Sequence, residues 1–206
     1  MKTQQKLFYI VLFLFCTALA FGGTIKNYSA DQVDVESNRV MGKLYAADSK
    51  FRMEMYDENG NIESFIIVRQ DQKKMYTFQA DGKTYMEFPI TGSNTSIYDS
   101  ITSIGQGIGI IPEIKREKEG NETVGGYNTE KFRTTTTIEF FGQKQTTTVY
   151  EWIAAEFDLP VRTQTDDITI EMRNIATTAQ AASLFEIPSG YSLMGNFMDL
   201  LQIFGQ

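Results

Sequence analysis

Apolar and polar residues alternate along short stretches of the chain from residue 32 onward, and turn residues separate these stretches. In FRMEMY, residues 51–56, Phe and Met occupy the odd positions, whereas Arg, Glu and Tyr occupy the even ones. Successive side chains of a β-strand point to opposite faces, so a period of two predicts a strand with one buried face. A chain built from such stretches is expected to fold as a sheet.

Short turns join the alternating stretches in the first half of the chain. Asn59-Gly60 is a strong hairpin signal, and residues 62–70 follow it as the returning strand. Residues 33–47 alternate unevenly, and residues 73–79 and 83–89 give two further strands around a turn at 80–82. These connections are too short for crossover helices, so the five stretches predict an antiparallel meander.

The β pattern resumes after Pro112. Gly125-Gly126 and residues 141–143 predict two hairpin turns, and two further strands flank Asp166-Asp167. The threonine runs 134–137 and 146–148 are β-branched and tolerate solvent, which favours exposed strand faces.

The only tryptophan of the chain lies in one of these later strands. The alternation places Trp152 on one face with Tyr150, and places Glu151 on the other face with Val149 and Ile153. Residues 155–158 are expected to form a corner, because Pro160 is tolerated near the start of the next strand.

The N-terminus has the pattern of a secretory signal peptide, residues 1–20. Two lysines precede the apolar run 7–20, which ends in the small-x-small sequence Ala18-Leu19-Ala20. The run is short for a membrane span, which needs about 20 apolar residues. Cys16 follows Phe15 instead of a small residue, which argues against lipidation. We therefore expect cleavage after Ala20, a single domain over residues 21–206, and a periplasmic or secreted location.

Composition argues against most catalytic and nucleic-acid functions. The sequence has no histidine, which removes the commonest general base and a common metal ligand, and its single cysteine leaves with the signal peptide. Removing Lys2 and Lys6 changes the formal net charge from −7 to −9, which disfavours nucleic acid as a partner. The acidic pair Asp166-Asp167 lies at a turn and is interpreted as solvated surface. We expect no catalytic residue, no metal site and no cofactor.

Two segments depart from the strand pattern. Residues 96–111 are rich in Gly, Ser and Thr, and their isoleucines recur at helical spacing, which predicts a short, glycine-weakened helix or a loop that acts as a lid. The predicted lid residues are Ile97, Ile101, Ile104 and Ile108. Residues 195–206 are expected to form a C-terminal helix or tail. The whole pattern predicts a mainly β fold, a single curved antiparallel sheet or unclosed β-barrel with one or two short helices as a lid.

The order of several motifs resembles the periplasmic lipoprotein-carrier (LolA/LolB-like) superfamily, in particular a branch of uncharacterised exported bacterial proteins. The motifs are Lys50-Phe51-Arg52, Val124-Gly125-Gly126-Tyr127, Trp152 before Leu159-Pro160-Val161, and Leu184-Phe185-x-x-Pro188-x-Gly190-Tyr191. The resemblance covers roughly residues 32 to 194. The long N-terminal helix of the true carriers has no counterpart in residues 22–32, so a general lipid-binding role fits better than lipoprotein transfer.

The resemblance implies a non-catalytic carrier or envelope-associated chaperone that holds a lipid or acyl chain in a concave sheet. The alternative is a structural or interaction module of the cell envelope, with an envelope protein as partner and no small-molecule ligand. Methionine adapts to irregular apolar ligands, although the same residues also fill ordinary cores. The predicted cavity wall consists of Phe51, Met53, Met55, Phe65, Met75, Phe78, Met86, Phe88 and Trp152.

The lid hypothesis makes a direct prediction. Replacing Ile104→Asp puts a charge on the apolar stripe of the insert, so it should weaken the binding of a fluorescent fatty acid while the melting temperature stays nearly unchanged. A fluorescence titration measures the affinity. An unchanged affinity contradicts the lid role.

Overall fold

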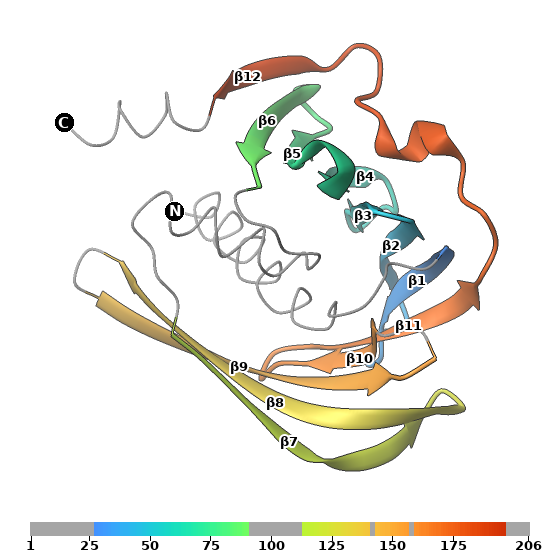
Figure 1. Ribbon diagram of the computed structural model, residues 1–206, viewed down its shortest axis with the longest axis vertical. Coiled ribbons are helices and arrows are strands. Elements are labelled where there is room, and N and C mark those ends of the chain that lie inside the picture. Colours follow the sequence, from blue (N-terminus) through green and yellow to red (C-terminus); the bar gives the residue numbers. More distant parts are fainter. Residues whose placement is uncertain (1–26, 91–112, 141–142, 157–158, 197–206) are drawn as a thin grey trace. The chain divides into compact units, whose positions relative to one another are not determined.

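The computed structural model describes residues 27–90, 113–140, 143–156 and 159–196 (Figure 1). Its strands form one unclosed sheet, in which neighbours hydrogen-bond in the order β12-β6-β5-β4-β3-β2-β1-β11-β10-β9-β8-β7. This confirms the predicted mainly β fold class. The strands are β1 Tyr28–Asp34, β2 Val40–Ala47, β3 Lys50–Tyr56, β4 Ile62–Arg69, β5 Lys74–Gln79, β6 Thr84–Pro89, β7 Glu113–Val124, β8 Tyr127–Phe140, β9 Gln143–Ala154, β10 Leu159–Gln164, β11 Thr169–Ala176 and β12 Ser192–Asn196. Within these ranges, two short 3₁₀ helices accompany the strands, η2 Gln70–Gln72 and η3 Ala182–Phe185.

The strands belong to two compact units. One unit holds β1 to β6 together with β11, η3 and β12, and the other holds β7 to β10. We call them the β1–β6 unit and the β7–β10 unit. β12 departs from the antiparallel expectation, because it pairs with β6 in parallel.

The predicted meander contains one more strand than expected. The unevenly alternating stretch 33–47 includes a turn at residues 35–39, which ends β1 and lets β2 begin. The Asp34 carboxylate accepts hydrogen bonds from the backbone N–H groups of Glu36 and Ser37, at 3.3 Å each, and from the Ser37 hydroxyl. Such local side-chain bonds stabilise a turn, and here they interrupt the period of two.

The two predicted glycine hairpins are present. Gly60 has a φ of 81° between β3 and β4, and Gly125 and Gly126 have φ of 58° and 87° between β7 and β8. A two-residue turn with both central φ values positive matches the right-handed twist of the flanking strands.

Five expectations concern, wholly or in part, residues outside the described part of the chain. These are the signal peptide 1–20, the lid-like insert 96–111, most of the C-terminal segment 195–206, the hairpin turn at 141–143, of which 141 and 142 are not described, and the corner at 155–158, of which 157 and 158 are not described. Residues 195 and 196 end strand β12, and residues 197–206 lie outside the described residues.

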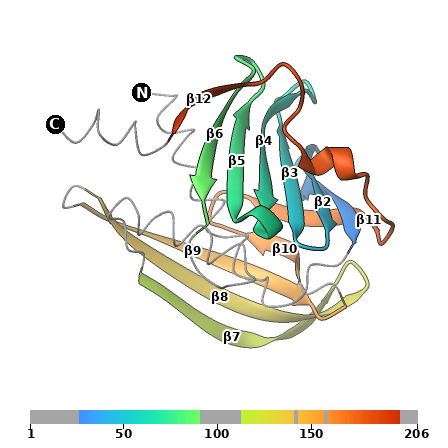
Figure 2. The same ribbon diagram turned by 45° about the horizontal axis from the view of Figure 1, so that its top comes forward.

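The C-terminal part of the β1–β6 unit covers one face of its strands. We call residues 177–191, between β11 and β12, the strap, and the face that it covers the strap face. Figure 2 shows η3, in orange, next to β3. The Phe185 side chain is buried in one cluster with Phe65 and Phe78. The Phe65 and Phe78 rings stack with centroids 4.2 Å apart, and the Tyr191 ring meets both edge-on.

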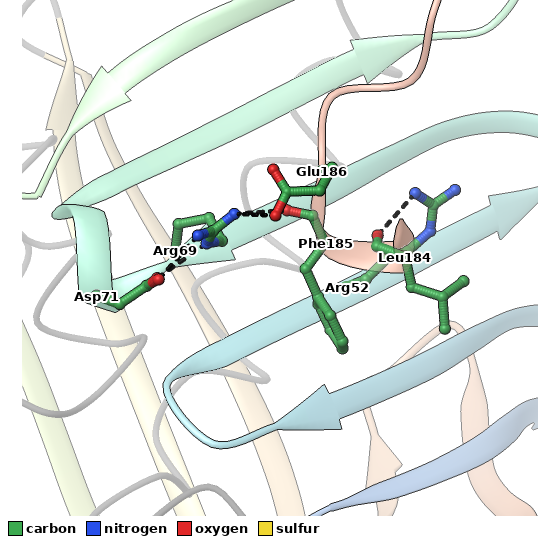
Figure 3. A network of polar contacts seen from close by, with 6 residues as sticks. All are labelled: Arg52, Arg69, Asp71, Leu184, Phe185 and Glu186. Carbon is green, nitrogen blue, oxygen red and sulfur yellow. Dashed lines mark hydrogen bonds and ion pairs between the residues drawn. The ribbon is translucent and has the colours of Figure 1, made fainter. Parts of the chain in front are cut away.

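Two buried arginines hold the strap through its backbone (Figure 3). Arg52 Nη1 donates to the Leu184 carbonyl at 3.1 Å, and Arg69 Nη1 donates to the Phe185 carbonyl at 3.2 Å. The Arg52 charge is balanced by Glu54, 2.8 Å away. Asp71 and Glu186 lie on either side of Arg69, at 2.8 and 2.7 Å. Paired in this way, the buried charges do not carry the large cost of isolated ions.

We predict that Phe185→Ala destabilises the protein by about 3 to 5 kcal/mol, the usual cost of removing a buried phenylalanine. Urea unfolding monitored by circular dichroism measures the change. Ile187→Ala is the control, because this strap side chain is 39% exposed and its removal should change the unfolding free energy by about 0.5 kcal/mol or less. Equal effects of the two substitutions contradict the role of Phe185 as the strap's apolar anchor.

Candidate functional site

The face opposite the strap face carries most of the predicted site residues. Directly opposed residues of paired strands share a face, and the register forms the cross-strand rows Phe51–Val68–Met75–Phe88 and Met53–Ile66–Thr77–Met86. Met55 lies on the same face, two residues after Met53 in β3. We call this surface the methionine face. It brings together six predicted residues: Phe51, Met53, Met55, Met75, Met86 and Phe88.

Phe65 and Phe78 do not belong to this group, and their prediction as part of the same wall is corrected here. Phe65 is paired with Glu54 and Phe78, so all three lie on the strap face. Each is one residue away in its strand from a residue of the methionine face, and a step of one reverses the direction of a side chain.

The methionine face combines apolar burial with unpaired polar atoms. Met53 and Phe51 are buried, whereas Met55 and Met86 are half-buried. Among the described residues, three buried side-chain atoms of this face have no hydrogen-bond partner: Tyr28 Oη, Gln32 Nε2 and Thr77 Oγ1. Tyr28 and Gln32 lie on this face because the register places them in the cross-strand rows Tyr28–Ala46–Phe51 and Gln32–Gly42–Met55.

Burial raises the pKa of the Tyr28 hydroxyl, so this group stays neutral and keeps its proton at physiological pH. Buried polar groups of native proteins are nearly always hydrogen-bonded, and each exception calls for an explanation. The three unpaired polar atoms on the methionine face therefore call for an explanation.

The β7–β10 unit contains a buried carboxylate between two apolar residues of the same strand face. Glu151 is fully buried, 0% exposed, and shares its face of β9 with Val149 and Ile153. Its Oε2 atom accepts a hydrogen bond from Thr134 Oγ1 at 3.0 Å, and Arg116 Nη2 lies 3.7 Å from the same oxygen. Burial outweighs these two favourable contacts and raises the pKa of Glu151 from 4.5 to about 7.

The threonine runs are only partly exposed. Thr134 and Thr136 are buried on the Glu151 face, which corrects the prediction of exposed strand faces for these two residues. Thr135 and Thr137 point to the other face of β8 and form hydroxyl contacts with Thr148 and Thr146, at 3.5 and 3.0 Å.

Trp152 lies on that other face of the β7–β10 unit, among charged residues. Its indole Nε1 donates to Glu122 Oε2 at 2.8 Å. The Lys131 ammonium and the Arg162 guanidinium lie 5.0 and 5.4 Å from the indole ring. These cation–π contacts cover the ring. Trp152 is therefore buried beneath polar side chains of its own unit.

Sequence reasoning did not single out Tyr28, Gln32, Thr77 or Glu151 as site residues. Glu151 alone has a usable local signal, because a carboxylate between Val149 and Ile153 interrupts an apolar face. Within the residues that the structure describes, no group of three or more His, Cys, Asp or Glu could hold a metal ion. The same residues include no helix long and apolar enough to span a membrane.

The chain belongs to the family described as "Domain of unknown function (DUF4412)", whose model matches residues 31–158. No curated protein matches the chain.

Several solved structures resemble the chain at low sequence identity. An uncharacterised conserved protein from Thermus thermophilus is 10% identical, with a TM-score of 0.48 over 95% of this chain and 99% of that one. The Mycobacterium tuberculosis lipoprotein LppX is 15% identical, with a TM-score of 0.36 over 83% and 97%. A putative outer membrane lipoprotein-sorting protein domain from Vibrio parahaemolyticus is 7% identical, with a TM-score of 0.33 over 78% and 89%. At these scores the similarity carries no argument about function.

Glu151 should make stability depend on pH. Between pH 4.5 and about 7 the folded protein retains a proton that the unfolded chain has lost, so the unfolding free energy falls as pH rises through this window and levels off above it. At 1.36 kcal/mol per pKa unit, the difference of 7 − 4.5 corresponds to about 3 kcal/mol. Glu151→Gln stays neutral and should remove that decline, as measured by urea unfolding from pH 4 to pH 8.

The control for this experiment is Glu130→Gln. Glu130 is exposed and forms an ion pair with Lys118. Its neutralisation should leave the decline between pH 4.5 and 7 in place. Identical pH profiles for Glu151→Gln and the wild type contradict the assignment to Glu151.

Proposed function

We propose that this protein is an exported, non-catalytic binder of an apolar ligand, a lipid or acyl chain, which it holds on the methionine face as a carrier or envelope-associated chaperone. One observation carries the proposal: the two faces of the same strands differ in how their polar groups are satisfied. On the strap face, the chain itself supplies aromatic packing, and Arg52 and Arg69 are hydrogen-bonded. On the methionine face, Tyr28, Gln32 and Thr77 each leave a buried polar atom unpaired among the described residues.

The energies favour a bound amphipathic molecule at such a face. A buried polar group without a partner costs about 1 to 3 kcal/mol, so three of them are expensive for the folded protein alone. Each buried methylene of an acyl chain contributes about 0.8 kcal/mol, and flexible thioethers fit an irregular chain. A ligand with a polar head could pair one or more of the free atoms while its tail contacts Met53 and Phe51.

A carrier role also agrees with the absence of histidine from the sequence. Without histidine, general base catalysis would depend on carboxylate, lysine or tyrosine groups. The predicted signal peptide supports export to a compartment where an apolar ligand needs protection from water.

A second candidate is an interaction module of the cell envelope that binds a partner protein and no small molecule. β12 lies at one end of the strand order, and its Leu193 and Met194 side chains are 52% and 53% exposed. An edge strand with exposed apolar side chains favours pairing with another chain.

Polar substitutions at the half-buried methionines test the first candidate. Met55→Gln and Met86→Gln nearly conserve side-chain length, so they should weaken the binding of a fluorescent acyl probe about five- to tenfold, an effect near the burial energy of one or two methylenes. The melting temperature should change by only a few degrees, because both side chains are partly exposed.

Met194→Gln is the matched control, since this methionine is already exposed. It should leave probe affinity unchanged. Equal affinities for all three variants and the wild type contradict ligand binding on the methionine face.

Native mass spectrometry of the protein purified from its own host separates the two candidates. A co-purified lipid mass that disappears after delipidation supports the carrier. A ligand-free protein that also fails to bind added acyl probes supports the interaction module.

A further inference from the structure

Two directly opposed residues of the β7–β10 unit each carry an unpaired buried polar atom. Glu151 and Thr163 are directly opposed in the pairing of β9 with β10, and opposed residues have Cβ atoms about 5 Å apart. Both residues are buried, and within the described part of the chain neither Glu151 Oε1 nor Thr163 Oγ1 has a hydrogen-bond partner. A carboxylate oxygen and a hydroxyl are therefore buried and unpaired on opposed residues of two neighbouring strands.

The polar groups next to Glu151 contact its other carboxylate oxygen, Oε2. Thr134 Oγ1 donates to Oε2 at 3.0 Å, and Arg116 approaches the same atom at 3.7 Å. The Arg116 guanidinium also lies 4.1 Å from the centre of the Phe132 ring, which holds it in that position. The protein thus provides partners for Oε2, whereas Oε1 has no hydrogen-bond partner among the described residues.

The chemistry of the pair selects a particular ligand group. Oε1 accepts hydrogen bonds, and the Thr163 hydroxyl both donates and accepts. A ligand hydroxyl can donate to Oε1 and accept from Thr163 at the same time, which pairs both atoms. A ligand carboxylate would be repelled by ionised Glu151, and a purely apolar chain would leave both atoms unpaired.

The surroundings indicate the rest of the ligand. Val149, Ile153 and Val161 are buried beside the pair, on the same two strands. Apolar side chains combined with a few polar groups are the usual lining of a small-molecule site, in which the polar groups fix orientation.

We propose that Glu151 and Thr163 form a polar anchor that binds the hydroxyl group of an amphipathic ligand with an apolar chain, such as a fatty alcohol or an acylglycerol. This inference rests on the proposed function, because it assumes that the protein binds apolar ligands. It adds a second polar recognition site, within the β7–β10 unit alone, together with the chemical group that this site binds and the two residues that recognise it.

The test compares two isomeric probes with the same number of carbon atoms, 1-decanol, which carries a hydroxyl donor, and methyl nonyl ether, which does not. Each is titrated against the mature full-length protein at pH 8 loaded with the apolar dye N-phenyl-1-naphthylamine, and dye displacement gives the affinity. Because hydrogen bonds to charged groups are the stronger ones, we expect the wild type to bind the alcohol about tenfold more tightly than the ether.

Thr163→Val and Glu151→Met each remove one half of the anchor with little change in shape. Either substitution should reduce the preference for the alcohol to about twofold or less while ether affinity stays near the wild-type value, because a single remaining partner forms one hydrogen bond. Thr136→Val is the matched control, since Thr136 is buried on the same face of the sheet but is not among the unpaired atoms. It should retain the full preference.

The possible failures are distinguishable. Equal affinity of the wild type for alcohol and ether, or a preference that survives both anchor substitutions, overturns the anchor and leaves apolar-ligand binding in place. If the wild type binds neither the dye nor the probes, the proposed function fails and the anchor fails with it. If Thr163→Val does not fold, as judged by circular dichroism, Glu151→Met decides the outcome.

Discussion

The hydrogen bonds from Arg52 and Arg69 to the carbonyls of Leu184 and Phe185 hold the strap on one face of the β1–β6 unit. The strap has an irregular backbone next to an apolar sheet, and buried carbonyl groups require partners. The arginines supply these partners, and acidic neighbours balance their charges. Phe185 then packs on the aromatic cluster, so the strap face is filled by protein.

The period of two in the sequence was sufficient to predict the sheet and most strands of the meander, because alternation and turn residues act locally. It was not sufficient to assign faces in β4. Residues 65–68 form an apolar run that is buried on both faces of the sheet, so no polar residue within it marks which face a side chain points to. Phe65 was therefore grouped with the methionines. Only the register with Glu54 and the position of the strap, far away in sequence, place it on the other side.

The candidate site was predictable where side-chain type and alternation agree, as for Met53 and Met55. The polar atoms of Tyr28, Gln32 and Thr77 were not predictable, because a polar residue in a strand is ordinarily exposed and its burial depends on elements distant in the sequence. Trp152 is a similar case. Its burial is expected for a large apolar residue, but strand pairing decides that Lys131 and Arg162 are the side chains that cover its ring. Glu151 is the exception, since its apolar neighbours mark it locally.

The strap also has a consequence for the order in which the protein folds. Arg52 and Leu184 are separated by 132 residues, so the aromatic cluster of the strap face cannot be covered until nearly the whole chain is available. Contacts of such long range form slowly, because the loop between them must be closed first. A chain that ends before η3 would keep Phe65 and Phe78 uncovered by the strap and accessible to chaperones and proteases. The strap thereby couples the completion of the fold to the completeness of the chain.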